Sequence, residues 1–410
     1  MEGAPDQTRP KRLDEEENEM SDVYVIESLR TPLGSFGGAF SDVEAPRLAA
    51  TVITGILERT GLSADAIDEV IVGQVLSGGS GQAPARQAMR YAGLPDSVSA
   101  LTINKVCGSG LKAIMLGAGS IKLGDAHVVL AGGMENMSLA PYALSKGRYG
   151  YRMGNGEMLD LLVHDGLTDP YSGKHMGLIA EQSVESNKLD RTLQDNFALS
   201  SYQKAQAALR DGVFNDEIVP VVKKTRQGEV VVREDEEPNK VDFKKLPELR
   251  PAFQKDGTIT AANASTINDG AAIALLASGE AVAKYGLKPK ARLVAYATNS
   301  VHPDQFAEAP VGAISKVCAK AGISTEDIDL FEINEAFAAV PLIACQRLRL
   351  DPERVNVNGG AVALGHPLGA SGARITATLV RELHQRKLRY GLATLCIGGG
   401  EAVAVILERV

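Results

Sequence analysis

The stretch "EAPRLAATVITGILERTGLSADAIDEVIVGQ", residues 44–74, has a second copy in "EAPVGAISKVCAKAGISTEDIDLFEINEA", residues 308–336. Each copy reads as Glu-Ala-Pro, an apolar helix, a Gly-Leu or Gly-Ile end, an acidic cap and a strand that finishes in polar residues. Three neighbouring stretches also pair: "DVYVIESLRTP" at 22 with "ARLVAYATNS" at 291, "CGSGLKAI" at 107 with "GASGARIT" at 369, and "VVLAGG" at 128 with "ATLCIGGG" at 393. Similarity over such a length predicts two homologous halves.

Strands and helices alternate in both halves, which predicts an α/β fold of βαβ units with helices packed against mixed sheets. We expect the halves at residues 22–145 and 286–410. The region between them, 146–285, begins Gly- and Tyr-rich and has few periodic apolar runs, so we expect a loop or lid domain. Residues 1–21 read as a disordered acidic leader without the apolar core of a secretory signal.

Composition excludes several classes of protein. The 410 residues are 44% hydrophobic and 23% charged, which is typical of a globular chain with two or three domain-sized units. A net charge of −8 without an aromatic-interleaved basic patch argues against nucleic acid as a partner. No stretch approaches the roughly 18 consecutive apolar residues of a membrane span, so we expect no membrane partner. The four cysteines lack metal-ligand spacing, which argues against zinc and a disulfide scaffold and favours the cytoplasm.

One of these cysteines, Cys107, stands in "NKVCGSGLKAI", residues 104–114. The small residues 108–110 allow a tight turn and a close approach of the backbone. Apolar residues at helical spacing follow, so Cys107 should lie near a helix N-terminus, where the macrodipole favours a thiolate. From this segment alone, a reactive role and inert packing are equally good interpretations.

The second half carries Gly369 where the first has Cys107, and His366 lies just before it in "NGGAVALGHPLGASG". Pseudo-twofold symmetry would bring equivalent strand ends together in the middle of the molecule, and with them His366 and Cys107. An imidazole beside a thiol can act as its base. The alternative is a histidine with a purely structural role.

Two more strand ends carry polar or reactive groups. Asn334 in "EINEAFAAVPL" could orient a water or a substrate oxygen, or the Asn-Glu pair could cap the next helix. Cys396 in "ATLCIGGGEAVAVILE" precedes glycines whose N–H groups suit an oxyanion hole, while its thiol suits proton transfer. The remaining cysteines, Cys318 and Cys345, lie on apolar helical stretches and read as packing.

The motifs "NKVCGSGLKA", "NASTINDGAA", "NEAFA", "GHPLGASGAR" and "CIGGG" occur in the order of the thiolase family, which residues 22–410 resemble. The resemblance implies the thiolase fold: two homologous halves in five α-β-α-β-α layers, with a loop domain inserted between them. It implies an acyltransferase in which Cys107 takes an acyl group from a thioester and His366 activates the thiol. Cys396 then removes a proton from a second acyl-CoA, and the carbanion attacks the acyl-enzyme in a Claisen condensation, or the sequence runs backwards as thiolysis.

The resemblance also implies the groups that bind. One oxyanion site would combine His366 with a water held by Asn334, and the other the backbone N–H groups of Cys107 and Gly398. The expected contacts of CoA and the acyl group are Ser265, His175, Met176, Leu167, Phe253 and Phe337. Packing is the competing interpretation for Leu167 and Phe253, and a helix cap for Ser265.

His175 in "KHMGLIAEQ" resembles the short-chain acetoacetyl-CoA thiolases, that is, acetyl-CoA acetyltransferases. Glu401, after the last glycine run, departs from the uncharged residue that is more usual there. The expected partner is acyl-CoA, with CoA as substrate and product, no other cofactor and no metal. The expected assembly is a homotetramer, while the physiological direction of the reaction stays open.

Four other functions compete with this one. A long-chain 3-ketoacyl-CoA thiolase would differ in substrate length alone. Decarboxylating ketoacyl synthases share the architecture but usually lack the second cysteine. A non-catalytic acyl-CoA-binding protein is disfavoured because all four reactive positions are intact. A nicotinamide dehydrogenase is disfavoured because "GAGS" at 117–120 lies in a helical run without the full glycine fingerprint.

Overall fold

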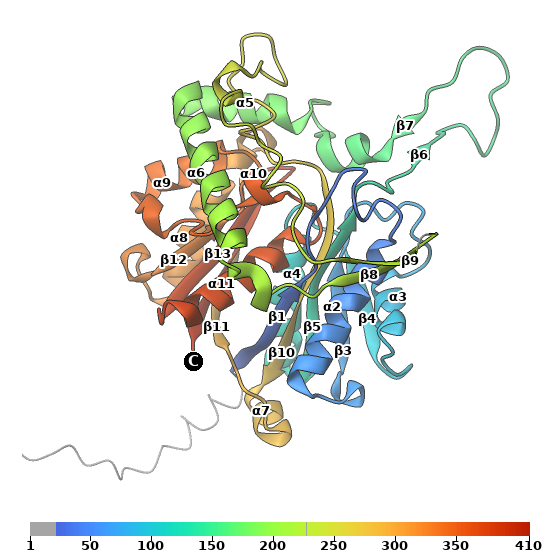
Figure 1. Cartoon of the computed structure of the whole chain (residues 1–410), viewed down its shortest axis with the longest axis vertical. Helices are drawn as coiled ribbons and strands as arrows, with labels where there is room; N and C mark the ends of the chain where they lie inside the picture. The colour runs from blue at the N-terminus through green and yellow to red at the C-terminus, as the bar shows by residue number, and fades with distance from the viewer. Residues whose placement is uncertain (1–21, 227) are drawn as a thin grey trace, which may run out of the picture.

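The computed structural model describes residues 22–226 and 228–410, so the predicted leader at 1–21 lies outside the described residues. Within them, both halves of the chain contribute to one ten-stranded sheet (Figure 1). The strands of the first half are β1 (Val23–Arg30), β10 (Asn268–Ser278), β5 (Val128–Asn136), β3 (Glu69–Gly73) and β4 (Ser99–Ile103), in that spatial order. Those of the second half are β11 (Ala291–Ser300), β14 (Glu401–Arg409), β13 (Tyr390–Ile397) and β12 (Leu330–Ile333).

The strand order is the same in the two halves. The order β1-β10-β5-β3 corresponds to β11-β14-β13-β12, and the halves join where β1 pairs antiparallel with β11. In each half the strand after the first helix is parallel to its neighbour, β3 to β5 and β12 to β13. The short β2 (Gly34–Ser35) adds to β10. The predicted repeat is therefore confirmed in the topology.

Helices complete five layers. The pair α4 (Ser109–Leu123) and α11 (Ser371–Gln385) lies between the two halves of the sheet, in a core that takes apolar side chains from both. The outer face of the first half is covered by α2 (Ala45–Thr60) and α3 (Pro84–Tyr91). The outer face of the second half is covered by α8 (Ala309–Ala321) and α9 (Ala339–Leu348). Cys318 and Cys345 contribute to this last core, as packing residues.

The two central helices approach each other closely enough that their backbones touch. A Cβ on Gly110 would lie 2.8 Å from the carbonyl oxygen of Gly369, and one on Gly372 would lie 2.4 Å from the backbone nitrogen of Leu111. Glycine at these two equivalent positions is what allows the crossing. The segment Val106–Leu123 is long and apolar enough by composition to cross a membrane, but here it forms this central helix and packs inside the fold.

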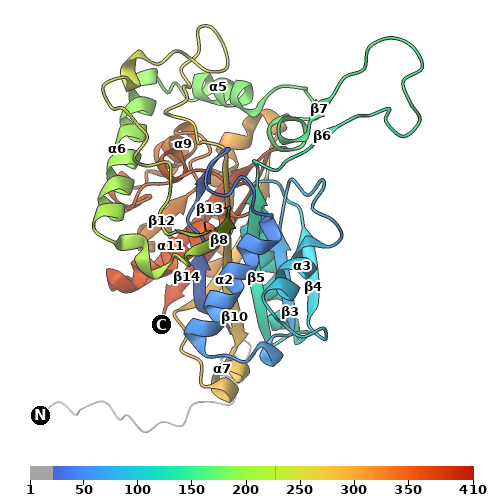
Figure 2. The ribbon, with the colours of Figure 1, turned by 45° about the vertical axis from the view of Figure 1, so that its right-hand side comes forward.

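The middle region of the chain supplies a cap of helices and loops over one end of the sheet (Figures 1 and 2). Its regular elements are β6 (Tyr142–Ala143), β7 (Leu159–Asp160), a π-helical turn (Leu162–Leu167), α5 (Met176–Ser186), α6 (Arg191–Arg210), β8 (Val221–Thr225) and β9 (Gly228–Val232). Two further short α-helices are α7 (Gly279–Tyr285), after β10, and α10 (Ala361–Leu364), which precedes α11 in the second half. The segment between β6 and β7 extends away from the body of the molecule.

One part of the region expected to be a loop domain differs from that expectation. Residues 268–278 form β10, which pairs with both β1 and β5 and is buried along its whole length. The stretch "GAAIALLA", residues 270–277, is an unbroken run of small and apolar residues, the pattern of a strand covered on both faces. The sheet of the first half therefore includes a strand from the end of the 146–285 region.

Candidate active site

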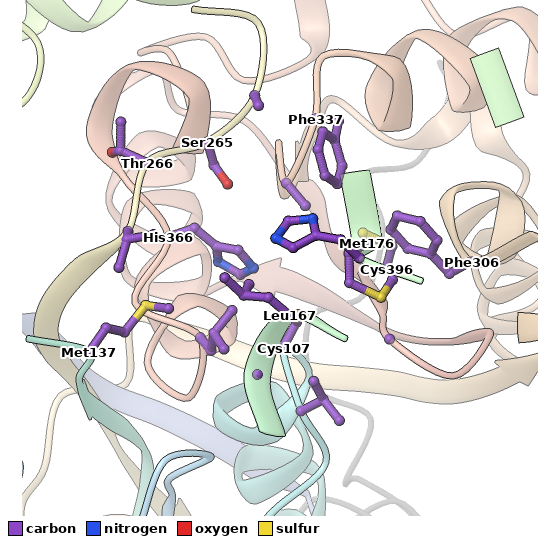
Figure 3. Close-up of a pocket in the computed structure, with 18 of the residues that line it drawn as sticks. Cys107, Met137, Leu167, Met176, Ser265, Thr266, Phe306, Phe337, His366 and Cys396 are labelled. Atoms are coloured by element: carbon purple, nitrogen blue, oxygen red, sulfur yellow. The ribbon is translucent and has the colours of Figure 1, made fainter. Parts of the chain in front are cut away.

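A cavity of about 230 Å³ lies where the ends of the strands meet the cap formed by the middle region (Figure 3). Every residue predicted for the site, except Asn334, lines it: Cys107, Leu167, His175, Met176, Phe253, Ser265, Phe337, His366, Cys396 and Gly398. The walls therefore come from both halves and from the middle region. Met137, Phe306 and Leu368 also line the cavity, and none of them was predicted.

The turn that carries Cys107 has an unusual backbone. Val106 has φ = 47°, a left-handed conformation that is rare for a β-branched residue. Its N–H donates to the Oδ1 of Asn104 at 2.9 Å. The Oγ of Ser109 accepts the N–H of Lys105 at 2.8 Å and donates to the carbonyl of Val106 at 2.7 Å. These local bonds hold the strained turn, which places Cys107 two residues before the first turn of α4.

The environment of Cys107 favours a protonated thiol. Burial raises the pKa of Cys107 to about 11, although the backbone N–H groups of Gly398 and of Cys107 itself donate to the sulfur and oppose that shift. The carboxylate of Glu135 raises it further. The helix N-terminus was expected to favour a thiolate, but the cost of desolvating the charge is larger than that effect. Nucleophilic attack by this group therefore requires a base.

His366 is suited to be that base. Burial lowers the pKa of His366 to about 3, with help from the positive charge of Arg374, so the imidazole is neutral. Its Nδ1 lies 2.6 Å from the Oγ of Ser371, and this hydroxyl donates to the carbonyl of Pro367 at 2.9 Å. Because the hydroxyl has one proton, it accepts from Nδ1–H, and Nε2 keeps the lone pair. Nε2 is buried and has no hydrogen-bond partner among residues 22–226 and 228–410.

Asn334 lies next to His366 but does not line the cavity. It is fully buried just after β12, with its Nδ2 at 3.5 Å from Nδ1 of His366. Its Oδ1 is buried without a partner in the part of the chain that the structure describes. The neighbouring Glu335 accepts from Ser201, from Asn356 and from the N–H of Val362, in α10. The Asn-Glu pair is therefore not a cap of α9, the helix that follows it.

Cys396 ends β13 inside the cavity and is 1% exposed. Burial and the neighbouring Cys107 raise the pKa of its thiol well above the ordinary value. The turn after it uses Gly399 and Gly400 at φ = 89° and 85°, a conformation that side chains disfavour. This turn presents the N–H of Gly398 to the sulfur of Cys107.

Four aromatic rings lie next to one another in the wall of the cavity. His175 stacks on Phe253 with 5.0 Å between the ring centroids, and Phe253 meets Phe337 edge to face at 6.1 Å. Phe306 continues this series against Phe337, also at 6.1 Å. His175 is the N-cap of α5, where its Nδ1 accepts the N–H of Gly177 at 3.1 Å. Leu167 and Phe253 thus pack and line the cavity at once.

Ser265 lies in an extended segment, and its own N–H donates to the carbonyl of Ala336 at 3.0 Å. No helix begins at Ser265, so the alternative interpretation as a helix cap was wrong. Its side chain faces the cavity (Figure 3). Glu401, the departure noted in the sequence, forms an ion pair of 2.6 Å with Lys105 and so joins the start of β14 to the cysteine turn.

Besides these lining residues, sequence reasoning missed three that fix the backbone or the histidine ring of the site. Ser371 fixes the ring of His366, and its place in "GHPLGASG" was the available signal. Asn268 accepts the N–H of His366 at 3.0 Å, from the motif that supplies Ser265. Val106 gave no signal, because side-chain type alone does not predict a left-handed backbone at a valine.

Comparison with known proteins agrees with this geometry. Residues 23–280 match the thiolase N-terminal domain, and residues 287–409 match the thiolase C-terminal domain. The chain is 51% identical over 392 residues to an acetyl-CoA acetyltransferase of Pseudomonas aeruginosa, covering 95% of this chain and 100% of that protein. It is 49% identical, with the same coverage, to a probable acetyl-CoA acyltransferase of Staphylococcus aureus.

Solved structures give the same result. The Bacillus anthracis acetyl-CoA acetyltransferase superposes with a TM-score of 0.93 at 44% identity, covering 96% of this chain and all of that one. The Acat5 thiolase from Ascaris suum, solved in complex with coenzyme A, superposes with a TM-score of 0.90 at 45% identity, covering 95% of this chain and all of that one. The chain therefore belongs to the thiolase family and is an acyltransferase.

Proposed function

We propose that this thiolase is an acetyl-CoA acetyltransferase, which condenses two acetyl-CoA to acetoacetyl-CoA and CoA and catalyses the reverse thiolysis. The observation that carries the proposal is the free Nε2 of a neutral, buried His366 in a cavity that both Cys107 and Cys396 line. The names of the relatives from Pseudomonas aeruginosa and Bacillus anthracis support the acetyl substrate.

The first half-reaction acetylates Cys107. Nε2 of His366 takes the thiol proton as the sulfur attacks the thioester carbonyl, and we assign the developing oxyanion to the N–H groups of Cys107 and Gly398, which lie beside the sulfur. A donor of this kind is worth about 3 kcal/mol of transition-state stabilisation. The carbon–sulfur bond to CoA then breaks, and the thiol of Cys396 protonates the departing CoA thiolate. This step leaves acetyl-Cys107, an imidazolium and a Cys396 thiolate.

The second half-reaction forms the new carbon–carbon bond. The Cys396 thiolate removes a proton from the methyl group of a second acetyl-CoA, and the carbanion attacks the carbonyl of acetyl-Cys107. The bond from that carbonyl to the Cys107 sulfur breaks, and the thiolate takes its proton back from His366. The thioester oxygen of the second acetyl-CoA becomes an enolate, and we assign its stabilisation to His366 with a water held by Asn334. Such a ping-pong sequence returns every proton and uses no cofactor besides CoA, which is a substrate.

The aromatic series His175, Phe253, Phe337 and Phe306 supports a short acyl group, because four rings packed against one another in the wall of a cavity of about 230 Å³ leave little room for a long chain. The test is CoA-dependent cleavage of acetoacetyl-CoA and of a long-chain 3-ketoacyl-CoA by one preparation. A strong preference for acetoacetyl-CoA is expected. Equal or better cleavage of the long chain would contradict the acetyl specificity and favour a 3-ketoacyl-CoA thiolase of fatty-acid oxidation. Inactivity on both would favour a non-catalytic acyl-CoA-binding protein.

We further propose that the enzyme acts in the cytoplasm as a homotetramer. Four free cysteines support a reducing compartment. The segment between β6 and β7 supports an assembly, because it projects from the body with Tyr149 at 91% and Met153 at 98% exposure. Light scattering on the purified protein should give the mass of four chains, and a mass of one or two chains would contradict the tetramer.

A further inference from the structure

A buried glutamate, Glu135, links the segment after β3, which lies beside Cys107, to the loop that carries His366, although it forms no hydrogen bond to the thiol of Cys107 or Cys396 within the described residues. Glu135 lies near the end of β5 and is fully buried. Its Oε1 accepts the N–H of Leu76 at 3.0 Å, and its Oε2 accepts the N–H groups of Val75 at 3.0 Å and Gly369 at 2.8 Å. All three donors are backbone groups, so the carboxylate holds loops rather than side chains.

The three donors belong to different halves of the chain. Val75 and Leu76 follow β3 in the first half, and they pack with Leu368 in a small apolar cluster against which Cys107 rests. Gly369 lies three residues after His366 in the second half and begins the approach to α11. One carboxylate therefore ties the wall beside the nucleophile to the loop that carries the base.

The backbone of the loop at Gly369 lies against the backbone of β5, with no room for a side chain between them. A Cβ on Gly369 would lie 2.6 Å from the carbonyl oxygen of Met134 and 2.9 Å from Oε2 of Glu135. Gly133 meets the same loop, because a Cβ there would overlap the carbonyl oxygen of Gly369. Such a close fit means that a small change in the bonds of Glu135 would move the whole loop.

We propose that Glu135 is a positioning residue that holds the His366 loop of the second half against the first half, so that Nε2 of His366 faces the thiol of Cys107. This inference rests on the roles proposed above for Cys107 and His366. Burial raises the pKa of Glu135 to about 7, while the three N–H donors oppose the shift. Three donors around two oxygens suit an acceptor-only carboxylate better than an amide, which would turn an N–H₂ group toward one of them.

The test is a double-mutant cycle between Glu135 and His366, read by alkylation of Cys107 with iodoacetamide. Glu135→Gln should slow alkylation at neutral pH by about tenfold to a hundredfold, the effect of a small misplacement of a catalytic group. In a His366→Ala background, the same change should slow alkylation by less than about threefold or speed it, because the base that Glu135 positions is already absent and loss of the Glu135 charge lowers the pKa of the Cys107 thiol. Peptide mass analysis would confirm that Cys107 is the alkylated thiol.

Glu181→Gln is the matched control. Glu181 is also a buried carboxylate that accepts backbone N–H groups, those of Thr258 and Ile259, but it touches neither catalytic loop. The Glu181→Gln substitution should lower the melting temperature by about as much as Glu135→Gln does, but it should leave the alkylation rate within about twofold of the parent. If Glu135→Gln does not fold, Glu135→Asp keeps the charge on a shorter side chain and should show a smaller slowing with the same dependence on His366.

Two outcomes would overturn the inference. One is an equal slowing by Glu135→Gln with and without His366, which would show a general structural effect. The other is an alkylation rate that Glu135→Gln leaves unchanged or that Glu181→Gln slows equally. Since alkylation needs no acyl-CoA, the result stands apart from the test of acetyl-CoA as substrate.

Discussion

Nδ1 of His366 lies 2.6 Å from Oγ of Ser371, and this contact decides which nitrogen of the imidazole carries the proton. The hydroxyl donates to the carbonyl of Pro367, so it can only accept from Nδ1–H. The basic lone pair therefore points from Nε2, away from Ser371. Ser371 therefore fixes the tautomer of the imidazole that we propose as the base.

Ser371→Ala should slow acetylation of Cys107 about tenfold or more, because both tautomers of His366 then become accessible. The measurement is the burst of CoA released from acetyl-CoA under single-turnover conditions. Thr376→Val is the control, because Thr376 lies on the same helix and its hydroxyl bonds only to the carbonyl of Gly372. An acetylation rate in Ser371→Ala equal to that of the control would show that Ser371 does not orient the ring.

The two cavity cysteines should fail at different steps when substituted. Cys107→Ser should form no acetyl-enzyme, whereas Cys396→Ala should still be acetylated on Cys107 but condense about 10²- to 10⁴-fold more slowly, the usual effect of losing a positioned acid or base. Mass spectrometry of the intact protein and acetoacetyl-CoA formation report the two steps. Cys318→Ala, which removes a packing thiol from α8, should leave both steps intact. Normal condensation by Cys396→Ala would remove that residue from the mechanism.

Acid should destabilise the protein through His366. The folded pKa of this group is about 3 and its ordinary value is 6.5, so the unfolded chain binds the proton between these values and the folded chain does not. The free energy of unfolding should fall as the pH falls from 6.5 toward 3, by up to about 1.4 kcal/mol per pH unit from this one group. Urea titrations of the parent and of His366→Gln should show a shallower fall in the variant. Equal slopes would mean that His366 titrates normally in the fold.

Gly369→Ala should destabilise the fold by about 1–3 kcal/mol, the usual effect of overpacking a filled interior. The new Cβ would lie 2.6 Å from the carbonyl oxygen of Met134 in a rigid strand. Gly119→Ala is the opposite case, because its Cβ would meet only the hydroxyl of Tyr296 at 3.7 Å, within α4. That change should stabilise the helix by about 0.5–1 kcal/mol. Urea denaturation gives both values, and a neutral Gly369→Ala would contradict the close packing of the two halves.

Much of the fold could be read from the sequence, because its evidence is local. The paired stretches at 44–74 and 308–336 carry the helical period and the strand ends of both halves, and these became α2 with β3 and α8 with β12. The strand β10 was missed because its run of small and apolar residues has no alternation, so its period does not tell it from a buried helix. A strand that is buried on both faces has no polar face to produce a pattern.

The residue pattern of the sequence predicted Cys107, His366 and Cys396, and its resemblance to thiolases predicted Ser265 and Phe337; all five line the cavity. Only the tertiary structure decided their charge states and orientations. Burial overrides the helix N-terminus at Cys107 and leaves His366 neutral, since desolvation depends on everything packed around a group and not on its neighbours in the chain. The bond from Gly369 to Glu135 likewise joins residues 234 positions apart, and only the crossing of the two halves brings them within reach.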